Sequence, residues 1–166
     1  MIPESGKKLI KSTRFLHLAT SHNDFPHVSL MNYTYYEDGD NQFIVISTPK
    51  DTTKYENITK NNKVSMLIHD WISDKKEENG RRNSLFELIT NLNKNELNSV
   101  SVMLNGECKV LQPTDEKFQF FKNLHLNNSN IDNKQLDNYA NDESALVLIT
   151  ISNCKITDIN DNIQEY

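Results

Sequence analysis

The chain has few of the residues on which phosphate loops, metal centres and covalent cross-links commonly depend. Its 166 residues include four glycines and two cysteines. The glycines stand far apart, which excludes the glycine-rich loops of P-loop and dinucleotide-binding proteins. Cys108 and Cys154 are also widely separated, so we expect reduced thiols rather than a zinc or redox pair. The five histidines show no metal-ligand spacing on one element, and no metal site is expected.

Long apolar runs and an excess of positive charge are missing as well. No apolar segment approaches the ~20 residues of a membrane-spanning helix, and the polar stretch from Pro3 to Lys8 has no signal-peptide core. A net charge of −5 argues against a general nucleic-acid-binding surface. We therefore expect a cytoplasmic or nuclear protein with no membrane or nucleic-acid partner. The length is that of a single domain spanning residues 1–166.

The patterns that are present predict a mainly β fold with flanking helices. Apolar alternation and turn signals predict six strands, at residues 15–20, 27–36, 43–47, 64–68, 100–111 and 145–151, the last of which could continue over 155–159. Helices are expected at residues 5–12, 53–61 and 84–97 and from Pro113 onward, with a polar surface loop containing one helical turn over 126–142. Mostly consecutive strand connections, with one helix between the third and fourth strands, indicate a small six-stranded barrel.

Two strands carry more specific expectations. Alternate side chains of residues 27–36 fall on two faces of one continuous strand. Asn105 and Gly106 interrupt the strand over residues 100–111 and predict a bulge or a bend there.

The most informative segment is residues 47–58, where an apolar strand runs into a new helix. Free amides and the positive end of a helix dipole make such a turn a natural seat for a phosphate group. Thr52 and Thr53 add hydroxyls, and Lys54 adds a full positive charge. Thr53 and Glu56 also have the spacing of a capping box, which closes a helix start without any ligand. Taken alone, the turn favours the cap.

Four segments, in their order and spacing, resemble the pyridoxamine 5'-phosphate oxidase-like family of FMN-binding split barrels. Residues 27–32 stand where the family has Arg-x-Val-Leu-Leu-Lys, and Ser47-Thr48 with residues 52–54 stand where it has Tyr-Thr followed by Ser-Arg-Lys. Residues 61–67 resemble the family's Asn-Pro-Arg-Val-Ser-Leu-Leu, and residues 101–111 resemble its strand around Gly-x-Ala. The segment 84–97, together with His69-Asp70-Trp71, resembles a fungal subgroup of short members.

The resemblance implies an FMN cofactor and assigns it a set of contacts. Lys54, Thr52 and Thr53 would hold the flavin phosphate, and Ser47 and Thr48 would contact the ribityl and phosphate region. The strand along the isoalloxazine ring would consist of His27, Val28, Ser29, Leu30, Met31 and Asn32, with its backbone amides bonding the polar ring edge. Ser101 would touch the flavin from a neighbouring strand. Because the family's flavin lies between two subunits, a homodimer is implied.

Departures from the family pattern keep three functions open. His27 and Thr53 replace arginines, Asn32 replaces the substrate-binding lysine, and the C-terminal Arg-Leu-Ser-Pro signature has no counterpart. Oxidation of pyridoxamine 5'-phosphate itself is therefore not expected. The chain could be a flavin-dependent oxidoreductase of unknown substrate, with no catalytic side chain identified. It could also be a flavin-binding carrier, sensor or dimeric adaptor without turnover, or a barrel that binds no flavin.

The remaining histidines and the single tryptophan give weaker signals. His17 and His27 are expected to be structural residues of their strands. His69 and Asp70 could position a proton, but adjacent strand residues point to opposite faces. Trp71 could stack near the flavin or pack in the core.

Overall fold

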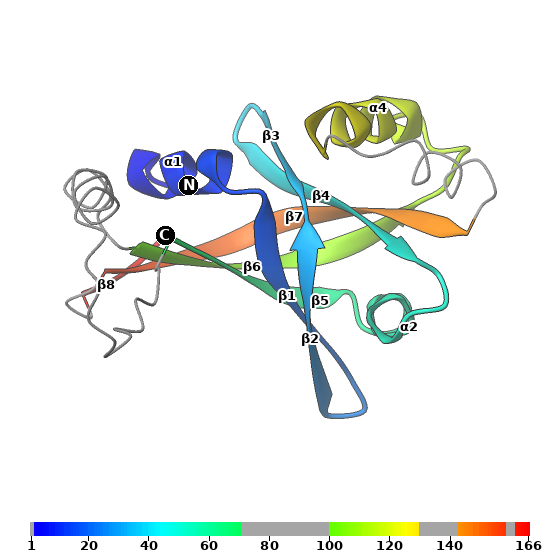
Figure 1. The fold of residues 1–166 in the computed structure, drawn as a ribbon, viewed down its shortest axis with the longest axis horizontal. Helices are drawn as coiled ribbons and strands as arrows, with labels where there is room; N and C mark the ends of the chain where they lie inside the picture. The colour runs from blue at the N-terminus through cyan, green and yellow to red at the C-terminus, as the bar shows by residue number, and fades with distance from the viewer. Residues whose placement is uncertain (1, 71–99, 130–142, 159–161) are drawn as a thin grey trace, which may run out of the picture.

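The computed structural model describes residues 2–70, 100–129, 143–158 and 162–166. Within them, eight strands form one antiparallel sheet in the order β2-β1-β5-β6-β7-β4-β3, with β8 paired to β7 (Figure 1). The strands are β1 (Phe15–His22), β2 (Phe25–Asn32), β3 (Thr34–Asp38), β4 (Asn41–Pro49), β5 (Lys63–His69), β6 (Val100–Leu111), β7 (Ser144–Asp158) and β8 (Ile163–Glu165). The predicted mainly β class is confirmed, with two more strands than expected.

Three helices flank the sheet in the described residues: α1 (Glu4–Ser12), α2 (Thr53–Lys60) and α4 (Phe118–Ser129). The first two lie where the sequence predicts them. The third begins later than Pro113 because a turn intervenes, in which the Asp115 amide donates to the Gln112 carbonyl at 2.8 Å. It then extends over residues 126–129, the start of the segment expected to be a loop with one helical turn. The helix predicted at 84–97 and Trp71 lie outside the described residues.

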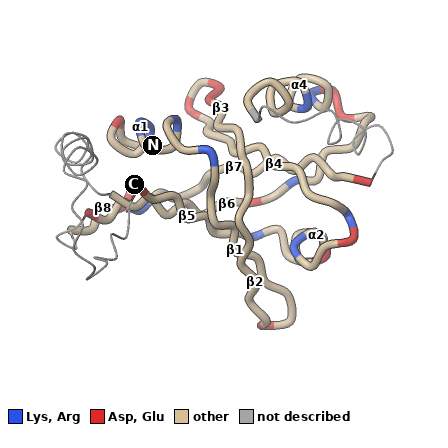
Figure 2. The backbone as a smooth tube through the Cα atoms, viewed as in Figure 1, with Lys and Arg blue, Asp and Glu red and all other residues tan. Residues whose placement is uncertain are grey.

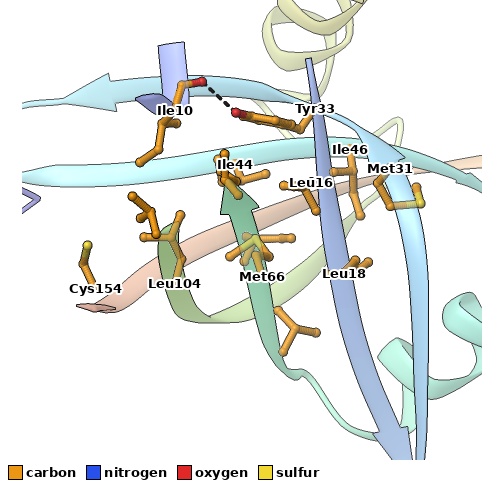
Figure 3. Close-up of a cluster of buried hydrophobic side chains, with 14 of the residues drawn as sticks. Ile10, Leu16, Leu18, Met31, Tyr33, Ile44, Ile46, Met66, Leu104 and Cys154 are labelled. Atoms are coloured by element: carbon orange, nitrogen blue, oxygen red, sulfur yellow. Dashed lines mark hydrogen bonds between the residues drawn. The ribbon is translucent and has the colours of Figure 1, made fainter. Parts of the chain in front are cut away.

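The prediction of one strand over residues 27–36 is wrong, because the strand is interrupted at Tyr33. This side chain turns into the core, where its hydroxyl donates to the Ile10 carbonyl at 2.7 Å and lies 2.7 Å from Thr13 Oγ1 (Figure 3). One residue thus separates β2 from β3, although they stand at opposite ends of the strand order. The sheet must therefore curl until its two edges approach one another. In the described chain no ladder joins them, so the barrel is split.

The core fills the inside of this curled sheet. Alternate residues of neighbouring strands supply it, among them Leu16, Leu18, Met66 and Leu104 (Figure 3). A smaller cluster under α4 contains Val45, Leu111, Phe121 and Leu146. Both clusters follow from strand alternation: every second side chain faces the inside of the sheet, and intervening side chains such as Val45 and Leu146 face α4 on the other side.

The predicted interruption of β6 is a bulge. The register with β7 shifts between Asn105 and Gly106, and a Cβ at Gly106 would lie 2.4 Å from the Thr150 carbonyl oxygen. Close backbone approach therefore requires glycine at this position.

Cys108 and Cys154 are buried free thiols, as expected from their spacing. Burial raises the pKa of Cys108 to about 12 and that of Cys154 to about 11. In the described chain, no helix is long and apolar enough to cross a membrane.

Charged residues concentrate on the helices and turns, and the bodies of β1 and β2 are almost free of them (Figure 2). One cluster ties α1 to β3. Lys7 Nζ lies 2.8 Å from Glu37 Oε1, and the Tyr35 hydroxyl donates to the same oxygen at 2.7 Å. These two contacts lower the pKa of Glu37 to about 2.

Candidate functional site

The start of α2 is closed by Thr52 rather than by Thr53. Thr52 Oγ1 accepts a hydrogen bond from the Tyr55 amide at 3.4 Å and donates to the Pro49 carbonyl at 2.8 Å. The predicted capping box of Thr53 and Glu56 is therefore wrong by one residue. The register is set by the turn, which brings Thr48 Oγ1 to 3.1 Å from Thr52 Oγ1. Those contacts occupy the Thr52 hydroxyl within the protein.

The cap leaves other donors at this helix end without a protein acceptor. Helix geometry gives the amides of Thr53 and Lys54 no carbonyl to bond within the helix. Thr53 is exposed and Lys54 is half-buried, and neither side chain makes a hydrogen bond or ion pair to another described residue. Lys50 and Asp51 in the preceding turn formally cancel in charge. Glu56 in the first turn balances the formal charge of Lys54. The features of this helix end that suit an anion are therefore the free amides, the Thr53 hydroxyl and the Lys54 ammonium group.

The β2 strand lies beside α2 and carries two unpartnered polar atoms. His27 pairs across the ladder with Thr20, whose hydroxyl accepts a hydrogen bond from Asn57 Nδ2 of α2 at 3.1 Å. His27 is thereby on the side of β2 that faces this helix. Its Nδ1 atom and the Ser29 hydroxyl, two residues along on the same face, are buried and have no partner among the described residues. Orphaned groups of this kind are costly, so they fit a ligand that bonds them.

The same strand has a free edge and an apolar opposite face. In the described chain β2 pairs with β1 alone, which leaves backbone groups along its other edge unpaired. Val28 and Leu30 point away from the core and are 64% and 61% exposed. The predicted two-face pattern is thus confirmed for residues 27–32. A planar, hydrogen-bonding ligand could lie along this edge.

Comparisons with known proteins identify the family of this chain. The model of the family described as pyridoxamine 5'-phosphate oxidase matches residues 2–153. The chain belongs to the pyridoxamine 5'-phosphate oxidase family. A pyridoxamine 5'-phosphate oxidase homolog of Schizosaccharomyces pombe is 30% identical over 99% of this chain and 90% of its own length. One from Saccharomyces cerevisiae is 33% identical over 94% and 90%. These relatives confirm the expected fungal subgroup.

Solved structures support the split barrel. A heme-binding protein of Mycobacterium smegmatis superposes with a TM-score of 0.68 at 13% identity, over the whole of this chain and 59% of that one. An FAD-binding protein of Mesorhizobium loti superposes with a TM-score of 0.61 at 16% identity, over 94% of both chains. At such identities the likeness concerns the fold alone.

The structure gathers most, but not all, of the residues that the family resemblance assigns. Ser47 and the fully buried Thr48 end β4 next to the cap, and β2 and β4 both contact α2. Ser101 is on β6, and β1 and β5 separate it from β2 within one chain. Asn32 is at the far end of β2, opposite Phe15. The role of Ser101 therefore stays a prediction that a second subunit would have to satisfy.

The histidine at the end of β5 behaves differently from the sequence expectation. Asp70 Oδ1 accepts a hydrogen bond from the Val100 amide at 2.8 Å and so closes the end of the β5–β6 ladder. His69 instead stacks on His17 of β1, with ring centroids 5.5 Å apart. Sequence reasoning missed this pair, although a register placing β5 beside β1 would have revealed it. No group of three or more potential metal ligands occurs among the described residues.

Proposed function

We propose that the chain binds FMN as a homodimer and acts as a flavin-dependent oxidoreductase on a small molecule. The observation that carries the proposal is the pair of buried, unpartnered atoms His27 Nδ1 and Ser29 Oγ beside the open end of α2. Membership of the pyridoxamine 5'-phosphate oxidase family supports a flavin, as does the description of one structural neighbour as FAD-binding.

The residues divide the task between an anion seat and a strand edge. Lys54, the Thr53 hydroxyl and the first-turn amides would hold the phosphate, with Ser47 nearby at the end of β4. Imidazole at His27 can donate a further hydrogen bond. The free edge of β2 would bond the polar side of the ring. Bound flavin would supply the electron transfer, and no catalytic side chain is assigned.

A second copy of the chain would cover an apolar surface that is open in one subunit. Phe15, Val28, Leu30 and Leu67 lie on neighbouring strands and are 52%, 64%, 61% and 39% exposed. Contiguous exposed apolar groups of this kind commonly mark an interface. Sedimentation at micromolar concentration should give a dimer, and Leu67→Glu should shift it toward monomer. A stable wild-type monomer that retains flavin would contradict the shared site.

A flavin-binding protein without turnover is the second candidate. Neutral Asn32 stands where the family resemblance places the substrate-binding lysine, and the C-terminal Arg-Leu-Ser-Pro signature has no counterpart, so affinity for the substrate of the named oxidase should be weak. We expect formation of pyridoxal 5'-phosphate to be absent or far below about 1 per second, the lower end of ordinary turnover. Ordinary turnover would instead make the chain a true oxidase.

The absorbance spectrum of the purified protein is the first experiment. Flavin bands, or binding of added FMN followed by fluorescence, would support the proposal. An intense heme band would instead favour heme binding, the property that the description of the mycobacterial neighbour states. A colourless protein that ignores FMN would identify the third alternative, a barrel without cofactor.

A further inference from the structure

We propose that two copies of the chain bind one divalent transition-metal ion, such as Zn²⁺, between them through His17 and His69. The two histidines belong to the adjacent strands β1 and β5, and both line a hollow of about 280 Å³. The metal site rests on the homodimer of the proposed function but not on its flavin. The ion would hold the two subunits together and take no part in electron transfer.

The His17 and His69 side chains are close enough to share one ion. Their ring centroids are 5.5 Å apart. Zn–N bonds of about 2.0–2.1 Å place the centroids of two imidazoles on one tetrahedral ion roughly 5 Å apart. The rings are nearly parallel, with an interplanar angle of 14°. Each ring would therefore turn about its χ2 torsion, which is soft in histidine, to direct a nitrogen at the ion.

The ring nitrogens of this pair have no other task in the described part of the chain. Neither imidazole has a hydrogen-bond or ion-pair partner there. Neutral imidazole is a common ligand of zinc, copper and nickel. Arg14 lines the same hollow, but its side chain has an interaction of its own. Its charge opposes a cation, so two imidazoles from a single chain should bind an ion weakly.

The missing ligands can come from the second copy, because His17 lies inside the surface which that copy is proposed to cover. The cross-strand partners of His17 are Leu30 on β2 and Leu67 on β5, and both belong to that surface. A two-fold dimer apposes the same surface of both copies, so residues near its centre meet their own counterparts. Two copies would thus bring together four imidazoles, the number of ligands in a tetrahedral zinc site.

Burial of these histidines in the dimer gives the ion a thermodynamic role. Each imidazole would leave water for an apolar interface, where a polar group without a partner is unfavourable. A shared ion would bond one nitrogen of every ring. Metal binding should therefore tighten the dimer. Because the four ligands come from two strands of two copies, no spacing within one element of the sequence could reveal them.

The test is calorimetric titration of the purified protein with Zn²⁺, for which we expect one ion per two chains. Sedimentation should show that saturating Zn²⁺ lowers the dissociation constant of the dimer at least about tenfold. Removal of the ion with EDTA should reverse this effect. Co²⁺ in place of Zn²⁺ should give the strong visible absorption of a tetrahedral ion.

His17→Gln and His69→Gln each remove two of the four ligands from the dimer. Each should weaken Zn²⁺ binding at least about a hundredfold, since loss of an outer partner of a metal ligand already costs about 10–100-fold. The matched control is His22→Gln, on the same strand as His17, which should bind Zn²⁺ like the wild type. His69 is exposed, so its variant remains informative if His17→Gln fails to fold.

Three results would overturn the metal site: one ion on each monomer, wild-type affinity in both variants, or a dimer whose stability ignores Zn²⁺. If such a dimer still binds FMN, the proposed function stands without the metal. If a zinc-bridged dimer takes up no flavin, the flavin function is wrong and the metal site stands.

Discussion

The helices α2 and α4 both cover the curled sheet, but the contacts that hold them in place differ in their balance. Besides Ile58, which is buried in the main core, α2 is held by hydrogen bonds: Asn57 donates to Thr20 on β1, and Asn61 Nδ2 donates to the Ser21 carbonyl at 3.1 Å. Aromatic rings fasten α4, where Phe121 packs edge-on against Tyr36 at 5.6 Å. The N-terminus of α2 thus has hydrogen-bond donors without a protein acceptor, whereas α4 covers the second hydrophobic cluster.

This difference between the two helices predicts that α2 matters mainly for ligand binding and α4 mainly for stability. A helix fixed by a few directed hydrogen bonds can keep its N-terminus open beside a strand edge. A helix fixed by buried rings supplies free energy of folding in proportion to the apolar area it removes from water. Substitutions in α4 should therefore affect stability, and substitutions at the start of α2 should affect ligand affinity.

Phe121→Ala should have the largest effect. This ring is 2% exposed, and loss of a buried phenylalanine costs about 3–5 kcal/mol of unfolding free energy. Urea unfolding measures it. Phe120→Ala is the matched control, because Phe120 is the preceding residue of the same helix but 47% exposed. Equal losses in the two variants would mean that α4 is not anchored as described.

Lys54→Ala should weaken FMN binding by about 1.5–3 kcal/mol, the scale of a hydrogen bond to a charged group. The affinity for riboflavin, which has no phosphate, should hardly change. The urea concentration at the midpoint of unfolding should not change either, because Lys54 makes no hydrogen bond or ion pair to another described residue. Fluorescence titration measures both flavins. Lys60→Ala, in the last turn of the same helix, is the control. Equal losses for FMN and riboflavin would place the phosphate elsewhere.

The buried His125 should make α4 sensitive to acid. Its Nδ1 lies 3.0 Å from Thr34 Oγ1, and burial lowers its pKa from 6.5 to about 4. The unfolded chain therefore takes up a proton first, so the stabilising contribution is complete above pH 6.5 and is lost as the pH falls toward 4. At pH 5 the loss should be about 1–2 kcal/mol. The unfolding free energy of His125→Gln should lack this loss between pH 6.5 and 4. If the variant and the wild type show the same pH dependence, His125 is not its source.

Thr52→Ala and Thr53→Ala should have the smallest effects, of opposite kinds. Removing the cap at Thr52 should cost about 1 kcal/mol of stability. Replacing Thr53 should leave stability unchanged but weaken FMN binding, because its hydroxyl has no acceptor among the described residues. Thermal unfolding measures the change in stability, and fluorescence titration measures the change in FMN affinity. If only Thr53→Ala lowers the stability, the capping box predicted for Thr53 and Glu56 would be correct after all.

Local patterns predicted the parts of the fold that depend on neighbours in sequence. The positions of most strands along the chain, the start of α2 within one residue and the bulge at Gly106 all follow from alternation, capping chemistry and glycine. The break at Tyr33 could not be predicted, because its cause is a hydrogen bond to Ile10 of α1, a contact between distant segments.

The candidate site was predictable in its residue types but not in its state of bonding. Sequence reasoning indicated a phosphate seat at the α2 turn from its hydroxyls, its lysine and the new helix start, whereas it assigned His27 to the expected flavin site by resemblance alone. The Thr52 hydroxyl is occupied because the turn brings it to the Pro49 carbonyl, whereas His27 Nδ1 and the Ser29 hydroxyl are buried without a partner among the described residues. Neither state of bonding can be read from residue types. Likewise, the His17–His69 pair exists only because β5 inserts beside β1.

The two buried cysteines make the protein a convenient host for site-directed labels. With thiol pKa values near 12 and 11, Cys108 and Cys154 stay protonated and shielded from alkylating reagents at neutral pH. A single cysteine introduced at the exposed Phe25 could then carry a spin or fluorescent probe without removal of the native thiols. In the proposed dimer, the distance between two such probes would report how one subunit is placed against the other.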